Sequence, residues 1–135
     1  MKRGGPLKRT RGLRKVSKKR ANLMREIAPD RSNYLFAYHL CANCGKAASD
    51  LHEIARGAHR EQAIAYPQSW LSVCRKCHDG PIGGMSIADQ LALKFFQSPE
   101  LYDRCIVNAI RGRAVNAVDE LEVLKAVAEV ARERA

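Results

Sequence analysis

The chain lacks any apolar run of the ~18 residues needed to cross a bilayer. No apolar segment follows its basic N-terminus, so the sequence does not predict a secretory signal. It also lacks internal repeats, and its 135 residues, 46% of them hydrophobic, predict one compact domain with a modest core and a tail. We therefore expect a cytoplasmic protein without a membrane partner, in which cysteines are metal ligands rather than disulfides.

Acidic side chains are absent from residues 1–20, which hold ten of the 24 Lys and Arg residues. The rest of the chain carries equal numbers of basic and acidic side chains, so this segment accounts for the whole net charge of +10. Having few large apolar side chains, residues 1–16 are predicted to form a disordered arm that contacts nucleic-acid phosphates. The candidate phosphate contacts in this part of the chain are Lys8, Arg9, Arg11, Arg14, Lys15, Lys18, Lys19 and Arg20.

Helix and strand signals follow the arm. Ser17 is a predicted helix cap, Pro29 is predicted to end that helix, and a second short helix completes an N-terminal helical segment over residues 17–40. Residues 50–54 ("DLHEI") and 69–73 ("SWLSV") have strand character, separated by a loop with a helical turn. The only tryptophan lies in the second of these strands, where we expect a core position.

The character changes to helix after the "GPIGG" break at residues 80–84, and residues 85–135 form a predicted C-terminal helical region. Ser86 and Ser98 are predicted helix caps. The last predicted helix has an apolar face, and its members at helical spacing are Leu121, Leu124, Ala128 and Ala131. We take these helices as packing elements, with a homodimer through the last one as an alternative.

The strongest motif is a pair of CxxC knuckles, Cys41–Cys44 and Cys74–Cys77. Four thiolates at this spacing predict a structural tetrahedral zinc site that contributes folding energy outright. Gly45 permits the positive backbone angle that lets the first two thiolates converge. The 29 residues between the knuckles exceed the ~15–20 of a simple zinc ribbon, so the core, residues 41–84, contains an insertion. The fifth cysteine, Cys105, is predicted to be a buried thiol on a helix.

The segments "CANCG", "DLHEIARG" and "SWLSVCRKCHDG" resemble the HNH (ββα-metal) endonucleases, most closely the four-cysteine zinc type of phages and prophages. The resemblance covers about residues 41–80. It implies a small α+β fold: a zinc-stapled ββα-metal core with flanking α-helices. It also implies a metal-dependent endonuclease that hydrolyses DNA, either linear or branched, in phage or prophage DNA processing or recombination inside the bacterial host cytoplasm.

Carried over residue by residue, the resemblance implies that the four knuckle cysteines hold zinc. His52 and His78 fall on the positions that bind the catalytic divalent metal. Glu53 falls where the family usually has its general-base His, and Ser69 falls where the family often has a loop-bracing Asn. At these two positions the chain departs from the family pattern.

Two assignments of the metal ligands and the general base remain open at this stage. Either His52 and His78 bind the metal and Glu53 is the base, or Glu53 and His78 bind it and His52 is the base. Phosphodiester hydrolysis needs an activated water, a cation and a base, and imidazole is the better base near neutral pH. Ligation by two histidines favours Zn²⁺, Mn²⁺ or Ni²⁺ over Mg²⁺.

Several neighbours are further candidates. Arg56 and Arg60 lie in the loop after "HEI" and are predicted to clamp the scissile phosphate, or else belong to a solvated loop. His59 is a substitute base in one reading and a loop residue in the other. Asp50 and Asp79 flank the histidines and either orient imidazoles as hydrogen-bond acceptors or are plain surface residues.

A second class of function competes with the nuclease. A non-catalytic zinc module that binds nucleic acid through its arm explains the cysteines and the charge, and a degenerate HNH protein retained as a regulator is a third reading. The binding module does not need His52, Glu53 or His78, so these three residues discriminate it from the nuclease, whereas Glu53 and Ser69 at the usual His and Asn positions keep the degenerate reading open.

Overall fold

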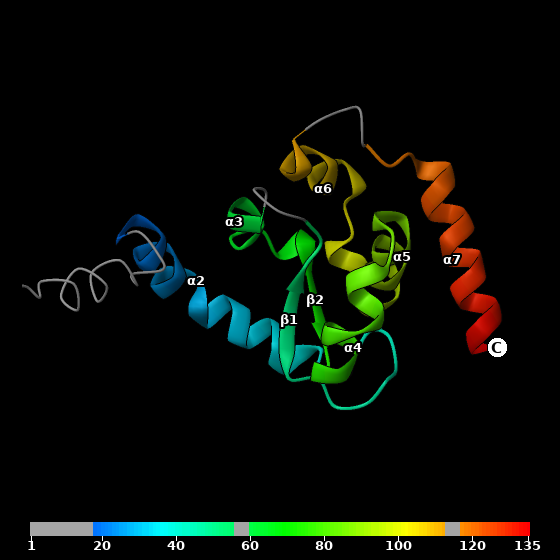
Figure 1. Ribbon diagram of the computed structural model, residues 1–135, viewed down its shortest axis with the longest axis horizontal. Coiled ribbons are helices and arrows are strands. Elements are labelled where there is room, and N and C mark those ends of the chain that lie inside the picture. Colours follow the sequence, from blue (N-terminus) through cyan, green and yellow to red (C-terminus); the bar gives the residue numbers. More distant parts are fainter. Residues whose placement is uncertain (1–17, 56–59, 113–116) are drawn as a thin grey trace, which may run out of the picture.

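The computed structural model describes residues 18–55, 60–112 and 117–135 and shows a small α+β arrangement (Figure 1). A two-stranded antiparallel sheet lies between helix α2 on one side and helices α4 and α5 on the other, with α7 outermost. The helices and strands are α2 (Lys18–Ala37), β1 (Asp50–Glu53), α3 (Arg60–Ala63), β2 (Trp70–Val73), α4 (Arg75–Asp79), α5 (Ile87–Gln97), α6 (Arg104–Arg111) and α7 (Glu120–Arg134). Short 3-10 turns occupy Pro67–Ser69, Pro81–Gly84 and Pro99–Leu101.

The two predicted strands are confirmed, and their register divides the site residues between two faces. Asp50 pairs with Val73, His52 with Leu71, and Glu53 with Trp70. Successive side chains of a strand point to opposite faces. Asp50 and His52 therefore share one face of the sheet, whereas Glu53 shares the other face with Trp70.

The Trp70 face of the sheet packs against α2. Trp70 is 1% exposed, as the core prediction for the tryptophan requires, and the Tyr34 ring meets it edge-on at 5.7 Å between centroids. The Arg31 guanidinium lies 5.3 Å from the Trp70 ring centroid. These contacts anchor the C-terminal half of α2. The predicted break at Pro29 is wrong, because α2 runs through this proline and the packing of its second half outweighs the one lost backbone hydrogen bond.

The outer edge of β2 is closed by side chains from α5. Lys94 is fully buried, and its Nζ donates to the carbonyls of Trp70 and Pro67, at 2.7 Å each. It also donates to the Tyr34 hydroxyl at 3.0 Å. Further along the edge, Gln97 accepts from the Ser72 N–H and donates to the Ser72 carbonyl. The edge is thus satisfied without a third strand.

The other face of the sheet contributes Leu71 and Val73 to the main core, where they join buried residues of α5 and its neighbours. Helix α7 packs on α5 through Val123 and Ala126. The apolar face predicted for this helix is therefore wrong, because Leu121 is 60% exposed and Leu124, the next residue of that stripe, 54%. Self-association through this exposed stripe stays a prediction.

The caps of the C-terminal helices follow the local signals in part. Ser86 caps α5, as predicted, by accepting from the Asp89 N–H at 3.1 Å. Ser98 instead precedes a 3-10 turn without a side-chain cap, and Asp103 caps α6. Cys105 lies on α6 but is exposed, which corrects the prediction of a buried thiol. None of the helices in the described ranges combines the length and apolar character needed to cross a membrane.

Lys94 gives the fold a pH-dependent contribution to stability. Burial lowers the pKa of Lys94 to about 7, with Glu100 acting in the opposite direction. An unfolded lysine keeps its proton up to about pH 10.4. Between these values the unfolded chain binds more protons than the folded one, so this group's contribution to stability rises with pH.

We expect the unfolding free energy of the wild type, relative to a Lys94→Met variant, to rise by about 1.4 kcal/mol per pH unit between about pH 7 and 10. Urea denaturation of both proteins in their zinc-loaded form, at several pH values in this window, measures the difference. If the difference in unfolding free energy between the two proteins does not change with pH, Lys94 stays protonated in the folded protein.

Candidate functional site

The first cysteine knuckle sits at the tip of a short hairpin before β1. Leu40 and Ala47 form an isolated bridge, and the Cys41 N–H donates to the Lys46 carbonyl at 2.6 Å. Gly45 has φ +80° and donates its N–H to the Cys41 carbonyl at 3.0 Å. The positive angle predicted for Gly45 is confirmed, and it closes the turn that brings Cys44 back toward Cys41.

The second knuckle is built differently, on the start of a helix. Cys74 is the N-cap of α4, and its Sγ accepts from the Cys77 N–H at 3.4 Å. One helical turn separates the two cysteines, so both sulfurs face the first knuckle. His78 follows within the same helix.

The four cysteines of the knuckles converge. Their sulfurs all lie within 4.8 Å of one another, and those of Cys44 and Cys74 are 3.7 Å apart. Zinc bonds of ~2.3 Å in tetrahedral geometry place sulfurs about 3.8 Å apart. Among the residues that the structure describes, this is the one group of three or more Cys, His, Asp or Glu side chains that converges in this way. The cluster can hold a zinc ion, as the spacing predicts.

The surroundings of Cys41 and Cys77 shift the pKa values of the two thiols in opposite directions. Burial raises the pKa of the Cys41 thiol, but backbone N–H groups, first that of Cys44 and then that of Cys74, outweigh it and lower the pKa to about 7. The Asn43 amide donates to the Cys77 sulfur at 3.4 Å. This bond lowers the pKa of Cys77, yet burial and the neighbouring sulfurs raise it overall to about 12. Sulfurs that resist ionising together are stabilised by a bound cation.

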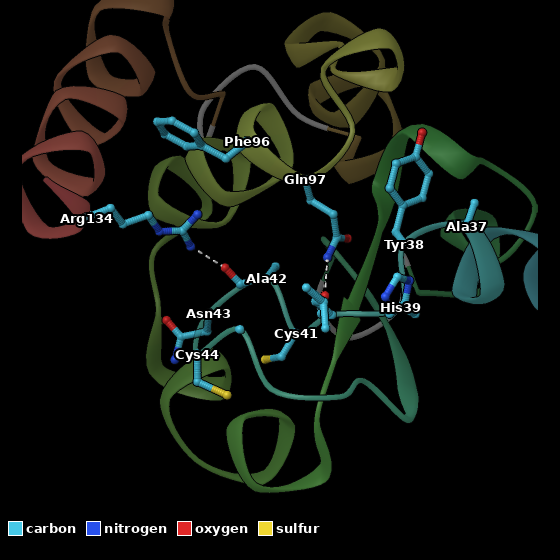
Figure 2. Close-up of a pocket in the computed structure, with 12 residues that line it drawn as sticks. Ala37, Tyr38, His39, Cys41, Ala42, Asn43, Cys44, Phe96, Gln97 and Arg134 are labelled. Atoms are coloured by element: carbon cyan, nitrogen blue, oxygen red, sulfur yellow. Dashed lines mark hydrogen bonds between the residues drawn. The ribbon is translucent and has the colours of Figure 1, made fainter.

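The first knuckle is fastened to the rest of the fold from two sides, as Figure 2 shows. Gln97 donates to the Leu40 carbonyl at 3.1 Å, and Arg134, near the end of α7, donates to the Ala42 carbonyl at 2.5 Å. A groove of about 600 Å³ lies between these contacts, with Phe96 in its wall. The knuckle thus packs against both α5 and α7.

A pair of histidines lies on the core-facing side of β1, next to the second knuckle. The rings of His52 and His78 are 5.4 Å apart between centroids and nearly perpendicular, at 77°. His78 Nδ1 lies 3.0 Å from the Asp50 carboxylate, and His52 Nε2 lies 2.7 Å from the Gln90 amide oxygen. The structure therefore brings together the two histidines that the resemblance pairs, each with one ring nitrogen hydrogen-bonded to a neighbour.

The charge state of Asp50 follows from its contacts. The hydrogen bond to His78 is the largest influence on the pKa of Asp50 and, with help from Ser49 and Arg75, holds it below the usual range against the effect of desolvation. The Arg75 Nε lies 3.3 Å from the same carboxylate, while its side chain is 71% exposed. Asp50 is thus an anionic acceptor, which orients His78 as predicted. Asp79 is exposed and contacts only Arg75, at 3.9 Å, among the ion pairs of the described residues.

Glu53 is directed away from the histidine pair. It lies on the opposite face of β1 and is 6% exposed, with its carboxylate 2.7 Å from the Arg31 guanidinium of α2. This ion pair fastens α2 to the sheet. The carboxylate that the sequence offers as base or metal ligand therefore has a structural partner on the α2 side of the sheet.

The remaining predicted residues divide into described and undescribed ones. Ser69 donates to the carbonyls of Ala63 and Tyr66, at 2.9 and 2.8 Å, and so braces the loop before β2. Arg56 and His59 lie outside the described residues, as does the side chain of Arg60 at the start of α3. The arm residues Lys8, Arg9, Arg11, Arg14 and Lys15 also lie outside them, whereas the first turn of α2 carries Lys18 and Lys19, both exposed, and Arg20, which is half-buried.

Sequence reasoning missed Gln90. It lies 38 positions from His52, inside a helix whose other buried residues are apolar except Lys94, and it is 2% exposed. A polar residue on the apolar face of a predicted helix is the one signal that could have drawn attention to it.

No family model, curated protein or solved structure matches the chain. A function for this chain is therefore inferred from the geometry of the site itself.

The convergence of the cysteines predicts that the purified protein carries one zinc ion per chain and that a Cys77→Ser variant loses it together with its cooperative thermal unfolding transition. Metal analysis and calorimetry measure both quantities. Cys105→Ser is the matched control, because its thiol is exposed on α6, and it should keep zinc and stability. A Cys77→Ser protein with full zinc content and unchanged unfolding would contradict the assignment.

Proposed function

We propose that this chain is a metal-dependent HNH-type endonuclease that hydrolyses DNA phosphodiester bonds, in phage or prophage DNA processing or recombination. The observation that carries the proposal is the pairing of His52 with His78, 5.4 Å apart between ring centroids and beside the cysteine cluster. A zinc module that only binds nucleic acid has no physical need for this pair.

The neighbours of the two rings support a metal-binding role. Histidines that bind metals commonly donate their other N–H to a carboxylate, carbonyl or amide oxygen. Asp50 is such an acceptor for His78, and the Gln90 oxygen lies 2.7 Å from His52. A divalent ion held by the two imidazoles would lower the pKa of water and stabilise the charge that develops on phosphate. Mn²⁺, Ni²⁺, Zn²⁺ and Mg²⁺ are the candidates, and imidazole ligands favour the first three.

The chain also offers positive charge to a phosphate at this place. Arg75 approaches Asp50 through its Nε, at the same carboxylate oxygen that His78 contacts, and its side chain is 71% exposed. Lys46 and Lys76, from the two knuckles, are exposed as well. An arginine oriented by a carboxylate is well suited to bind a phosphate oxygen. We assign this role to Arg75, together with the predicted clamps Arg56 and Arg60.

Glu53 has no part in the chemistry that we propose. Its buried ion pair with Arg31 supports the sheet, so the metal would activate the attacking water by lowering its pKa. The proton would pass to solvent, or to a histidine of the pair that does not bind the metal. The same observation favours the alternative function. A family position that usually holds the base is here a structural residue, which is what a degenerate HNH protein or a non-catalytic zinc module that binds nucleic acid would have.

A plasmid-cleavage assay separates these functions. The zinc-loaded protein should nick or cut DNA when Mn²⁺, Ni²⁺ or Mg²⁺ is added, and His78→Ala should lower the rate by at least about 100-fold. His39→Ala is the control, because His39 lies ahead of the first knuckle, outside the histidine pair. It should cleave at the wild-type rate, and both variants should retain zinc.

Two outcomes would overturn the nuclease. A folded His78→Ala protein that cleaves as fast as the wild type would remove the histidine pair from the chemistry. Plasmid left intact with every metal, by a protein that still binds DNA, would establish the binding module instead.

The basic arm predicts a salt-dependent interaction with the DNA backbone. Deleting residues 1–16 removes seven Lys and Arg residues. For every phosphate that the arm no longer neutralises, the plot of log affinity against log salt should become flatter by about 0.9. Binding isotherms of the full and shortened chains at several salt concentrations measure the slope. An unchanged slope would exclude the arm as the main phosphate-binding segment.

A further inference from the structure

Gln90 joins helix α5 to the histidine pair. Its side chain is 2% exposed and uses both ends of its amide: the nitrogen donates to the Met85 carbonyl at 2.9 Å, and the oxygen lies 2.7 Å from His52 Nε2. Such a buried amide costs free energy unless both ends are paired. Its two contacts therefore fix which end faces the histidine.

The Met85 carbonyl determines the direction of the hydrogen bond between Gln90 and His52. A carbonyl oxygen can only accept, so the Gln90 nitrogen must face Met85 and the Gln90 oxygen must face His52. An amide oxygen also only accepts, so His52 Nε2 must donate. In the neutral ring this leaves the lone pair on Nδ1.

His78 is held in the opposite tautomer. The Asp50 carboxylate accepts, so Nδ1 of His78 donates, and the lone pair of the neutral ring lies on Nε2. The two partners come from different parts of the fold: Asp50 from β1, two residues before His52, and Gln90 from α5, beyond the knuckles. Each histidine is therefore oriented independently of the other.

We infer that Gln90 is a positioning residue that holds His52 as the Nε2–H tautomer, so that His52 acts through Nδ1 while His78 acts through Nε2. The part that concerns metal binding rests on the proposed function, whereas the tautomer does not. The inference extends the site beyond the residues between the knuckles, because α5 supplies one of its fixed groups.

Gln97 provides a matched control on the same helix. It lies two helical turns after Gln90 and also makes amide hydrogen bonds with both ends. Its hydrogen bonds join the backbone of Ser72 and Leu40 and the Tyr34 hydroxyl, and neither histidine. Gln97→Leu should therefore remove a half-buried amide from the same helix without touching the orientation of His52.

The experiment is ¹H–¹⁵N NMR of the imidazole nitrogens, on protein carrying one zinc and at a pH above the ordinary histidine pKa of about 6.5. In the wild type, His52 should be protonated on Nε2, and its N–H proton should be protected from solvent exchange. Gln90→Glu keeps an acceptor and should keep the protected proton, as should Gln97→Leu. Gln90→Leu should lose it.

Titration with Ni²⁺ into the same one-zinc proteins is the second readout. Calorimetry should show Ni²⁺ affinity reduced by about 10–100-fold in Gln90→Leu and unreduced in Gln90→Glu and Gln97→Leu. A His52 protonated on Nδ1 in the wild type would overturn the inference without any variant. So would a Gln90→Leu protein that keeps both the protected proton and the wild-type affinity.

These readouts separate the two proposals. A protein that shows the expected tautomer and Ni²⁺ affinities but never cleaves DNA would contradict the nuclease and leave the role of Gln90 standing. A protein that cleaves DNA but has His52 protonated on Nδ1 would contradict the role of Gln90 and leave the nuclease standing.

Discussion

The convergence of four sulfurs is the constraint on which the rest of the structure depends. The hairpin that carries Cys41 and Cys44 leads directly into β1, and the helix that carries Cys77 also carries His78. A metal that joins the two knuckles therefore fixes the distance between β1 and α4, and with it the hydrogen bond from His78 to Asp50. In a sheet of only two short strands, the hydrophobic core alone would hold this geometry poorly.

The two faces of the sheet hold different groups of side chains. On the α2 side, the Arg31–Glu53 ion pair and the ring of Trp70 fasten the long helix. On the other side, His52 reaches α5 and approaches His78. The pleat of a strand makes this division unavoidable for adjacent residues. It explains why the "HE" of "DLHEI" cannot act as one unit while the strand stays regular.

Local features of the fold could be predicted from the sequence, and features set by distant partners could not. The positive angle of Gly45 and the approach of the two sulfurs within each CxxC knuckle depend on a few residues, and both are confirmed. Glu53, Gln90 and Lys94 depend on partners on other elements, between 22 and 60 positions away. Helix α7 has apolar residues on more than one face, so its periodicity alone could not show which face α5 would cover. The motif spacing therefore predicts which residues come near one another, but the partners of each side chain depend on the tertiary structure.

The account requires two separate sets of ligands: sulfur alone for the structural zinc, and imidazole for the reacting metal. X-ray absorption at the zinc edge, on protein loaded with one zinc per chain, tests this directly. The account predicts four sulfur neighbours at about 2.3 Å and no nitrogen. A mixed shell of sulfur and imidazole nitrogen would contradict it, because a histidine would then belong to the structural centre and the proposed reaction centre would lose a ligand.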